Sequence, residues 1–212
     1  MCTISRKLRR IYISSPRTSS MQSFWENVTG PLVANGNISK EDEGVYQYAV
    51  KSIFILGANV LISLLIGIVM DEPWYCMLFL LALIPLRSDA GGYHAPNMPV
   101  CYLLSFASLI FTLLGVKEIQ LFPRISIVIV AFLSTLLIFN YAPLESKNRP
   151  LTNQEKMSIR KRARKIVCVE MVLGMVLLFV NRKAAFAISS AIFWCAVGYV
   201  AWFVEKKILR EK

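Results

Sequence analysis

Long apolar runs, separated by short charged or proline-containing breaks, constrain this chain more than any other feature. A helix needs about 20 apolar residues to cross the hydrocarbon core of a bilayer, and several of the runs approach that length. Hydrophobic residues make up 56% of the chain and the mean hydropathy is +0.53, too apolar for a soluble domain. The pattern predicts an all-α, polytopic membrane protein with about six transmembrane helices. The runs are residues 52–70, 74–86, 100–116, 125–142, 166–180 and 184–204.

The distribution of lysine and arginine decides the predicted topology. The run 74–86 is short enough to be re-entrant. If it spans and the N-terminus is cytoplasmic, most of the 24 Lys and Arg residues lie on the cytoplasmic side, as is usual for membrane proteins. If it does not span, the strongly basic segment 143–165 would lie outside. We therefore expect six spans, both termini in the cytoplasm, and a cytoplasmic segment at 87–101.

The chain divides into four predicted parts: residues 1–20, 21–51, 52–205 and 206–212. The first part is basic, Ser-rich and aperiodic, typical of a disordered arm, unless translation begins at Met21 instead of Met1. The second is half polar and predicts an interfacial or cytoplasmic helix. The third is the transmembrane helical domain, with a basic cytoplasmic loop at 143–165, and the fourth is a basic tail. No apolar stretch follows the basic start, so we expect no cleavable signal peptide.

Charge and cysteine content exclude several function classes. The net charge of +11 is better explained by basic cytoplasmic loops than by nucleic-acid binding, because no aromatic-interleaved basic groove or nucleic-acid motif occurs. The five cysteines show no paired spacing, and the chain has one histidine. We therefore expect no disulfide framework, no metal site and no organic cofactor.

One polar stretch, residues 87–101, reads R-S-D-A-G-G-Y-H-A-P-N-M-P-V-C and lies between apolar runs. Polar, irregular backbone at membrane depth is costly unless it lines a cavity or is buried in protein, so this stretch is the predicted place of chemistry. It holds the only histidine, His94, and a cysteine, Cys101, at the start of the next run. An adjacent imidazole generates the thiolate form of a cysteine, and a helix N-terminus stabilises that anion. The stretch predicts a Cys–His nucleophile pair.

Five further residues of this stretch are candidates for supporting roles. Arg87 could bind a carboxylate of an acidic substrate or raise the positive potential near the thiolate, although a lone arginine there is also typical of a positive-inside anchor. Gly91 and Gly92 permit close approach of an extended peptide, and their N–H groups could form an oxyanion hole, although such a pair alone is more often just a turn. Asp89 is a candidate to orient His94, with Asn97 as the competing candidate.

The stretch resembles the accessory gene regulator protein B family, membrane cysteine endopeptidases that process staphylococcal-type quorum-sensing peptide precursors. Four residues of the stretch occupy positions that the family uses: Arg87, Gly92, His94 and Cys101. The sequence Y-A-P-L-E-S-K-N-R-P-L-T, at residues 141–152, is similar to the family's second signature. The resemblance extends from Phe24 to the C-terminus and includes the order of the apolar runs.

The resemblance implies a mechanism and partners. Cys101, activated by His94, would release the C-terminal tail of a short precursor and hold the remainder as a thioester. A thiol or hydroxyl within the held peptide would then close a thiolactone or lactone ring. The resemblance also implies a bacterial cell membrane, a precursor with an amphipathic leader and an acidic tail, and a possible homodimer. Basic residues then become candidate docking residues for the precursor: Arg87, Arg160, Lys161 and Arg162.

Two other classes of function are compatible with a six-helix membrane protein. The first is a non-enzymatic transporter or exporter of a small peptide, which would need no thiol at Cys101. The second is a structural or sensor protein whose basic loop binds anionic lipid or a kinase. A transporter should tolerate Cys101→Ser, and the sensor should tolerate changes at both Cys101 and His94.

Overall fold

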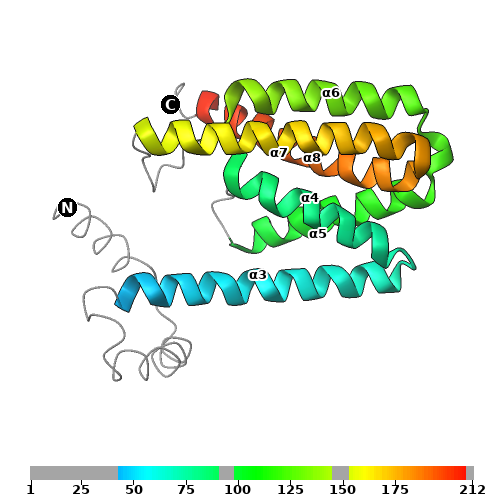
Figure 1. Cartoon of the computed structure of the whole chain (residues 1–212). Helices are drawn as coiled ribbons and strands as arrows, with labels where there is room; N and C mark the ends of the chain where they lie inside the picture. The colour runs from blue at the N-terminus through cyan, green and yellow to red at the C-terminus, as the bar shows by residue number, and fades with distance from the viewer. Residues whose placement is uncertain (1–42, 91–97, 145–152, 209–212) are drawn as a thin grey trace. The chain divides into compact units, whose positions relative to one another are not determined.

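The computed structural model describes residues 43–90, 98–144 and 153–208, and every regular element in these ranges is helical (Figure 1). The predicted all-α class is confirmed, whereas the number of spans and the side on which the termini lie stay predictions. The predicted arm at 1–20 lies outside the described residues. The elements are α3 (Glu43–Val69), α4 (Pro73–Ala90), α5 (Met98–Lys117), the short 3-10 helix η1 (Ile119–Leu121), α6 (Arg124–Tyr141), α7 (Asn153–Val180) and α8 (Arg182–Ile208).

Two helices extend beyond the apolar runs that predicted them. α7 begins at Asn153, so much of the basic segment expected to be a loop is helix. The physical reason is that no proline or glycine follows Pro150 there, and its Gln, Glu, Lys and Arg residues are good helix formers. α4 likewise continues through Ala90, where a loop was expected from Arg87 onward. The pair Gly91-Gly92 follows directly, and glycine is a poor helix former.

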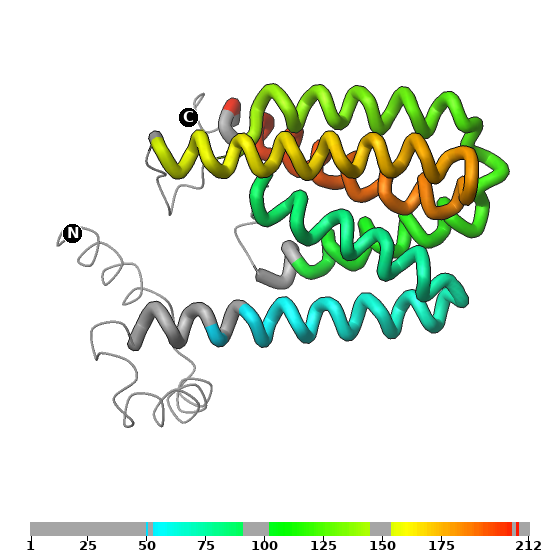
Figure 2. Tube along the Cα trace, in the orientation of Figure 1, coloured from blue at the N-terminus to red at the C-terminus, as the bar shows by residue number. Residues whose placement is uncertain are grey.

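The chain forms two compact units, residues 1–58 and 59–212. The first contributes only the helical residues 43–58 to the described structure. In the second unit, α8 is the central helix and packs against α4, α5, α6 and α7. α7 also packs against α4 and α6, and the trace in Figure 2 shows α6, α7 and α8 running alongside one another.

Small side chains allow α8 to have so many neighbours. Alanine and serine let helix backbones approach closely, which is how helices often associate in membranes. Most buried residues in the first half of α8 are of this kind: Ala184, Ala185, Ala187, Ser189, Ser190 and Ala191. Further along, larger buried residues, including Cys195 and Tyr199, join a core cluster with Leu86 and Ala90 of α4 and with Ala163 and Val167 of α7. This cluster surrounds the end of α4 that precedes the predicted reactive stretch.

The exterior of the helices is strongly apolar. Two helical stretches are long and apolar enough to cross a membrane, Arg124–Tyr141 with mean hydropathy 1.9 and Arg182–Val204 with 1.8. Two shorter apolar helical stretches are Ile53–Val69 and Tyr102–Lys117. Large patches of exposed apolar side chains are rare on soluble monomers, so this surface indicates a membrane protein. On α6 the exposed apolar side chains include Ile125, Ile129, Phe132, Leu133 and Leu136.

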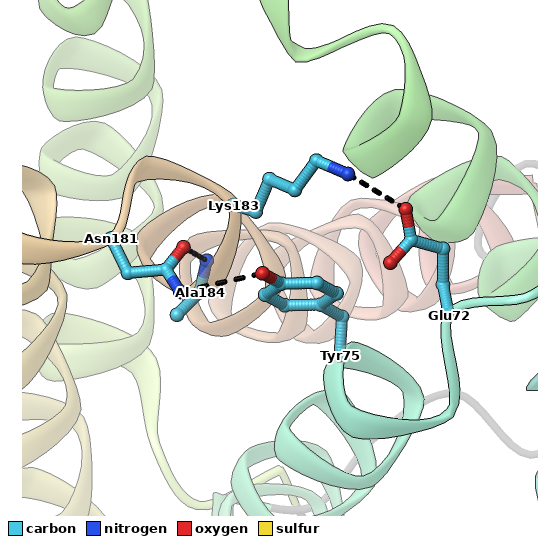
Figure 3. A network of polar contacts seen from close by, with 5 residues as sticks. All are labelled: Glu72, Tyr75, Asn181, Lys183 and Ala184. Carbon is cyan, nitrogen blue, oxygen red and sulfur yellow. Dashed lines mark hydrogen bonds and ion pairs between the residues drawn. The ribbon is translucent and has the colours of Figure 1, made fainter.

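Polar contacts fasten the turn between α7 and α8 to the start of α4 (Figure 3). The Asn181 side-chain oxygen accepts a hydrogen bond from the backbone N–H of Ala184 at 3.1 Å, which satisfies a donor at the start of α8. The Asn181 side-chain nitrogen donates to the Tyr75 hydroxyl at 3.3 Å. Lys183 pairs with Glu72 at 2.8 Å. These contacts hold the end of α4 opposite to Arg87.

Candidate functional site

The structure describes part of the predicted reactive stretch. Arg87 and Asp89 lie in the last turn of α4, whereas Gly91, Gly92, His94 and Asn97 lie outside the described residues. α5 begins at Met98, so the backbone of Cys101 lies in its first turn. A helix N-terminus carries a partial positive charge that favours a thiolate. The backbone position of Cys101 is therefore compatible with the predicted role, and the pairing of Cys101 with His94 stays a prediction.

The last residue of α4 is held by two hydrogen bonds from distant parts of the chain. The carbonyl oxygen of Ala90 accepts one from the hydroxyl of Tyr199 in α8. It accepts another from the backbone N–H of Leu144, at 3.1 Å. Leu144 belongs to the second signature-like sequence, 141–152, so the two sequence motifs meet at this carbonyl. The motifs are about fifty residues apart along the chain, and the spacing of residues did not predict the contact.

Asp89 has a partner on α7. Its carboxylate lies 3.6 Å from the guanidinium of Arg162, and the two side chains are 20% and 63% exposed. Asp89 was a candidate to orient His94, and Arg162 was a candidate to bind the precursor. Their ion pair connects the end of α4 to the basic start of α7, and both candidate roles stay predictions. A pair this exposed contributes about 0–1 kcal/mol, so it positions the two helices more than it stabilises them.

The basic start of α7 also binds the end of α6. Arg160 donates to the carbonyl of Asn140 at 3.0 Å, and Arg164 donates to the carbonyl of Phe139 at 3.0 Å. The Arg164 guanidinium also lies over the Phe139 ring, 4.2 Å from its centroid. The last carbonyls of a helix have no partner within the helix, so these arginines satisfy acceptors that would otherwise need water. Lys161, the remaining docking candidate, is exposed.

Sequence reasoning did not single out Glu170. Its side chain is buried in α7 with 7% exposure, and among the described residues no donor bonds its Oε2 atom. Glu170 lies on α7, which packs against α4, α6 and α8. The signal that could have found Glu170 is its position as the lone acid in the apolar run 166–180.

The other described cysteines are free thiols. Cys76 and Cys195 are buried and Cys168 is exposed. The Cys76 thiol donates to the carbonyl of Ser63 at 3.2 Å, as a small buried residue with a weak donor does. Over the described ranges, no three His, Cys, Asp or Glu side chains gather as metal ligands would.

These features define an all-helical membrane protein whose polar helix ends gather around one end of α4. The chain belongs to the accessory gene regulator B family, whose model matches residues 25–199. It is similar to AgrB-like protein 2 of Clostridium perfringens strain 13 and to an AgrB-like protein of C. perfringens strain SM101. Each is 21% identical over 174 residues, which cover 78% of this chain and 81% of the relative. No solved structure is significantly similar to the chain.

The resemblance predicted from the two motifs is thus confirmed. Membership of the family associates the protein with agr-type quorum sensing and with the membrane.

Proposed function

We propose that this protein is a membrane cysteine endopeptidase that removes the C-terminal tail of a short autoinducing-peptide precursor and promotes its cyclisation. The observation that carries the proposal is the meeting of the two motifs at the Ala90 carbonyl, next to a helix whose first turn contains the backbone of Cys101. Family membership supports the substrate class. The protein would need neither a metal nor an organic cofactor for this chemistry.

The proposed reaction has two acyl-transfer steps. His94 accepts the thiol proton of Cys101, and the thiolate attacks the carbonyl carbon of the bond before the tail. The C–N bond breaks, the tail leaves as an amine with the proton from His94, and a thioester joins the precursor to Cys101. A thiol or hydroxyl within the precursor then attacks the thioester. Cys101 leaves, and a thiolactone or lactone ring is formed. Gly91, Gly92 and Arg87 are proposed to stabilise the oxyanion or bind the substrate.

The proposed orientation places this reaction on the cytoplasmic side of a bacterial cell membrane, with six spans and both termini inside. Its support is the concentration of Lys and Arg in the loops that this topology places inside. The basic start of α7 is the proposed docking surface for an acidic tail. Because Arg160 and Arg162 have partners within the chain, Lys161 is the residue of that set whose charge we expect the precursor to meet first. A homodimer stays a proposal from the family.

The decisive experiment is mass spectrometry on membranes that contain the full-length protein and its cognate precursor. We expect the unaltered protein to yield a shortened precursor and a thiol-sensitive acyl adduct on the peptide that contains Cys101. Cys101→Ala should abolish both products, and Cys101→Ser should form no thioester. Cys168→Ser, the matched change at an exposed cysteine of α7, should leave processing unchanged.

The same experiment separates the alternatives. Tail cleavage that persists in Cys101→Ala would overturn the endopeptidase proposal. Export of an already processed peptide that tolerates Cys101→Ser would favour the transporter.

A further inference from the structure

The side chain of Glu170 is a buried acid that the proposed mechanism does not use. It is 7% exposed, and within the described ranges no donor bonds its Oε2 atom and no ion pair includes it. An ionised carboxylate removed from water is strongly unfavourable without an opposite charge or several donors, whereas the neutral acid costs far less to bury. The burial therefore favours a carboxyl group that carries its proton.

The register of α6 and α7 places Glu170 level with Thr135. The start of α7 binds the end of α6, and Ile127 near the start of α6 shares a core cluster with Leu178 near the end of α7. The two helices are therefore antiparallel. Thr135 lies eight residues after Ile127, and Glu170 lies eight residues before Leu178. Because every residue advances a helix by the same rise, equal steps from one contact lead to one level.

Both side chains also lie on the helix faces that meet. One small cavity has Val128 of α6 and Gly174 of α7 in its lining. Thr135 follows Val128 by seven residues and Glu170 precedes Gly174 by four, and these spacings keep residues on one face of a helix. A Cβ atom at Gly174 would lie 3.6 Å from the hydroxyl oxygen of Ser189 in α8. Hydroxyl-bearing residues of α6 and α8 thus occur beside this part of α7.

The hydroxyl of Thr135 lacks the kind of partner that other buried hydroxyls have. Ser108 and Thr112 of α5 each donate to a carbonyl of their own helix at 2.8 Å. Thr135 Oγ1 is buried and bonds to no atom of the described residues. α6 is long and apolar enough to cross a membrane, and Thr135 lies away from both of its ends. Unbonded polar atoms are costly at that depth, so Thr135 and Glu170 each require a partner.

The helices packed against α7 bring few ionisable groups toward Glu170. α6 has none between its first and last residues. α8 has Cys195 and Tyr199 in the buried cluster that begins one turn away, and α4 has Arg87 and Asp89 in its last turn. A thiol and a phenol are ordinarily neutral at neutral pH, and the two charges of α4 are of opposite sign. These surroundings suit a neutral carboxyl.

We infer that Glu170 and Thr135 form a proton-binding site inside the bundle, in which the carboxyl is kept as the neutral acid and the Thr135 hydroxyl is its hydrogen-bond partner. A carboxylic acid and a hydroxyl each donate and accept, so the pair satisfies both orphaned atoms. Neither atom is bonded in the described conformation, so the pairing takes a change of rotamer or one bridging water molecule. The inference does not depend on the proposed endopeptidase function.

The first test uses the unaltered full-length protein in membranes at neutral pH, treated with a membrane-soluble carbodiimide. The proton of the acid passes to a carbodiimide nitrogen and the carboxyl oxygen bonds to the central carbon. The acyl group then moves to nitrogen, and the stable N-acylurea retains the mass of both reactants. We expect mass spectrometry to find this adduct on Glu170 and not on the exposed Glu118. Glu170→Gln should remove the adduct, and Glu118→Gln should leave it unchanged.

Infrared difference spectra in lipid nanodiscs test the proton and its partner separately. Subtracting the spectrum of Glu170→Gln should leave the carbonyl stretch of a protonated acid and no carboxylate band. Thr135→Val keeps the shape and removes the hydroxyl, so it should shift this stretch. Ser126→Ala removes a hydroxyl of α6 that bonds within its own helix, so it should cause no shift.

A carboxylate band in place of the acid stretch, or no adduct on Glu170, would overturn the proton-binding site. An acid stretch that Thr135→Val does not move would refute the pairing with Thr135. The labelling of the unaltered protein needs no variant, so it decides the matter even if Glu170→Gln does not fold. None of these measurements involves precursor cleavage, which Cys101→Ala tests separately.

Discussion

The carbonyl oxygen of Ala90 is the atom at which α4, α8 and the second sequence motif meet. It accepts hydrogen bonds from α8 and from the chain after α6, and it immediately precedes Gly91. A carbonyl can accept two hydrogen bonds, so both donors are accommodated at once. The last residue of α4 is therefore held by residues far away in the sequence.

Removing one of these donors should weaken the anchor without orphaning the carbonyl. Tyr199→Phe deletes the hydroxyl and keeps the buried ring, whereas the N–H of Leu144 still bonds Ala90. We expect a loss of about 1 kcal/mol in stability, typical of one hydrogen bond, together with slower precursor cleavage. Thermal unfolding in detergent and the single-turnover rate measure the two effects. Tyr141→Phe, at an exposed tyrosine, should leave the stability unchanged.

At the residue scale the sequence predicted the kinds of residue but not their partners. The sequence singles out Arg87, His94 and Cys101, because few polar residues lie between the apolar runs. Side chains that can act as nucleophiles or bases are fewer still. The partner of Asp89 could not be predicted, because Arg162 lies more than seventy residues away on a segment expected to be a loop. Glu170 was missed because a single acid does not change the hydropathy of its run.

At the scale of helices, α7 joins the others by two different kinds of surface. One face of its apolar half packs against α4, α6 and α8, and its basic half contacts the end of α6 through Arg160 and Arg164. Hydropathy could predict the apolar half of α7 but not the basic half. The basic half is helical because its residues favour that state and because its arginines donate hydrogen bonds to the last carbonyls of α6.

The contact of Arg164 with α6 should be measurable in stability. Arg164→Ala removes a hydrogen bond to Phe139 and the stacking of the guanidinium on its ring. We expect the free energy of unfolding to fall by about 1–2 kcal/mol, the combined size of one such bond and a partly desolvated cation–π contact. Lys165→Ala, the neighbouring change at an exposed residue, should have little effect. Equal losses in both variants would mean that the contact carries no specific stability.

The ion pair that ties α8 to the start of α4 should respond asymmetrically to mutation. Lys183 is 36% exposed and Glu72 is 12% exposed, so the carboxylate depends more on its partner than the ammonium does. Lys183→Ala leaves a poorly hydrated carboxylate, whereas Glu72→Gln leaves an ammonium that can reach water. We expect Lys183→Ala to cost about 1 kcal/mol more than Glu72→Gln. Thermal unfolding of the two variants decides this, and the reverse order would contradict it.

For the molecule as a whole, the proposed topology assigns each end of the bundle to one side of the membrane. The all-helical class could be predicted from hydropathy, since buried and lipid-facing positions are both apolar. The packing of α8 at the centre could not, because small residues occur in many helices and the sequence does not say which ones meet.

Chemical labelling tests the topology. With six spans and a cytoplasmic N-terminus, Glu118→Cys lies outside and Lys161→Cys lies inside. A membrane-impermeant maleimide applied to intact cells should label the first and not the second, and both should react after lysis. Mass spectrometry of the labelled peptides distinguishes them from the native cysteines. Labels in the reverse pattern would contradict this topology, because they require either that α4 does not span or that the N-terminus lies outside.

The match to the family ends at residue 199, and Tyr199 is the residue whose hydroxyl reaches Ala90. The hydroxyl of Tyr199 in α8 therefore holds the place where the chain leaves α4, more than a hundred residues earlier. A nascent chain can form this hydrogen bond only after Tyr199 has been synthesised and α8 has inserted beside α4. The anchor at Ala90 is thus completed only when α8 is present, and the proposed nucleophile Cys101 would lack its finished surroundings until then.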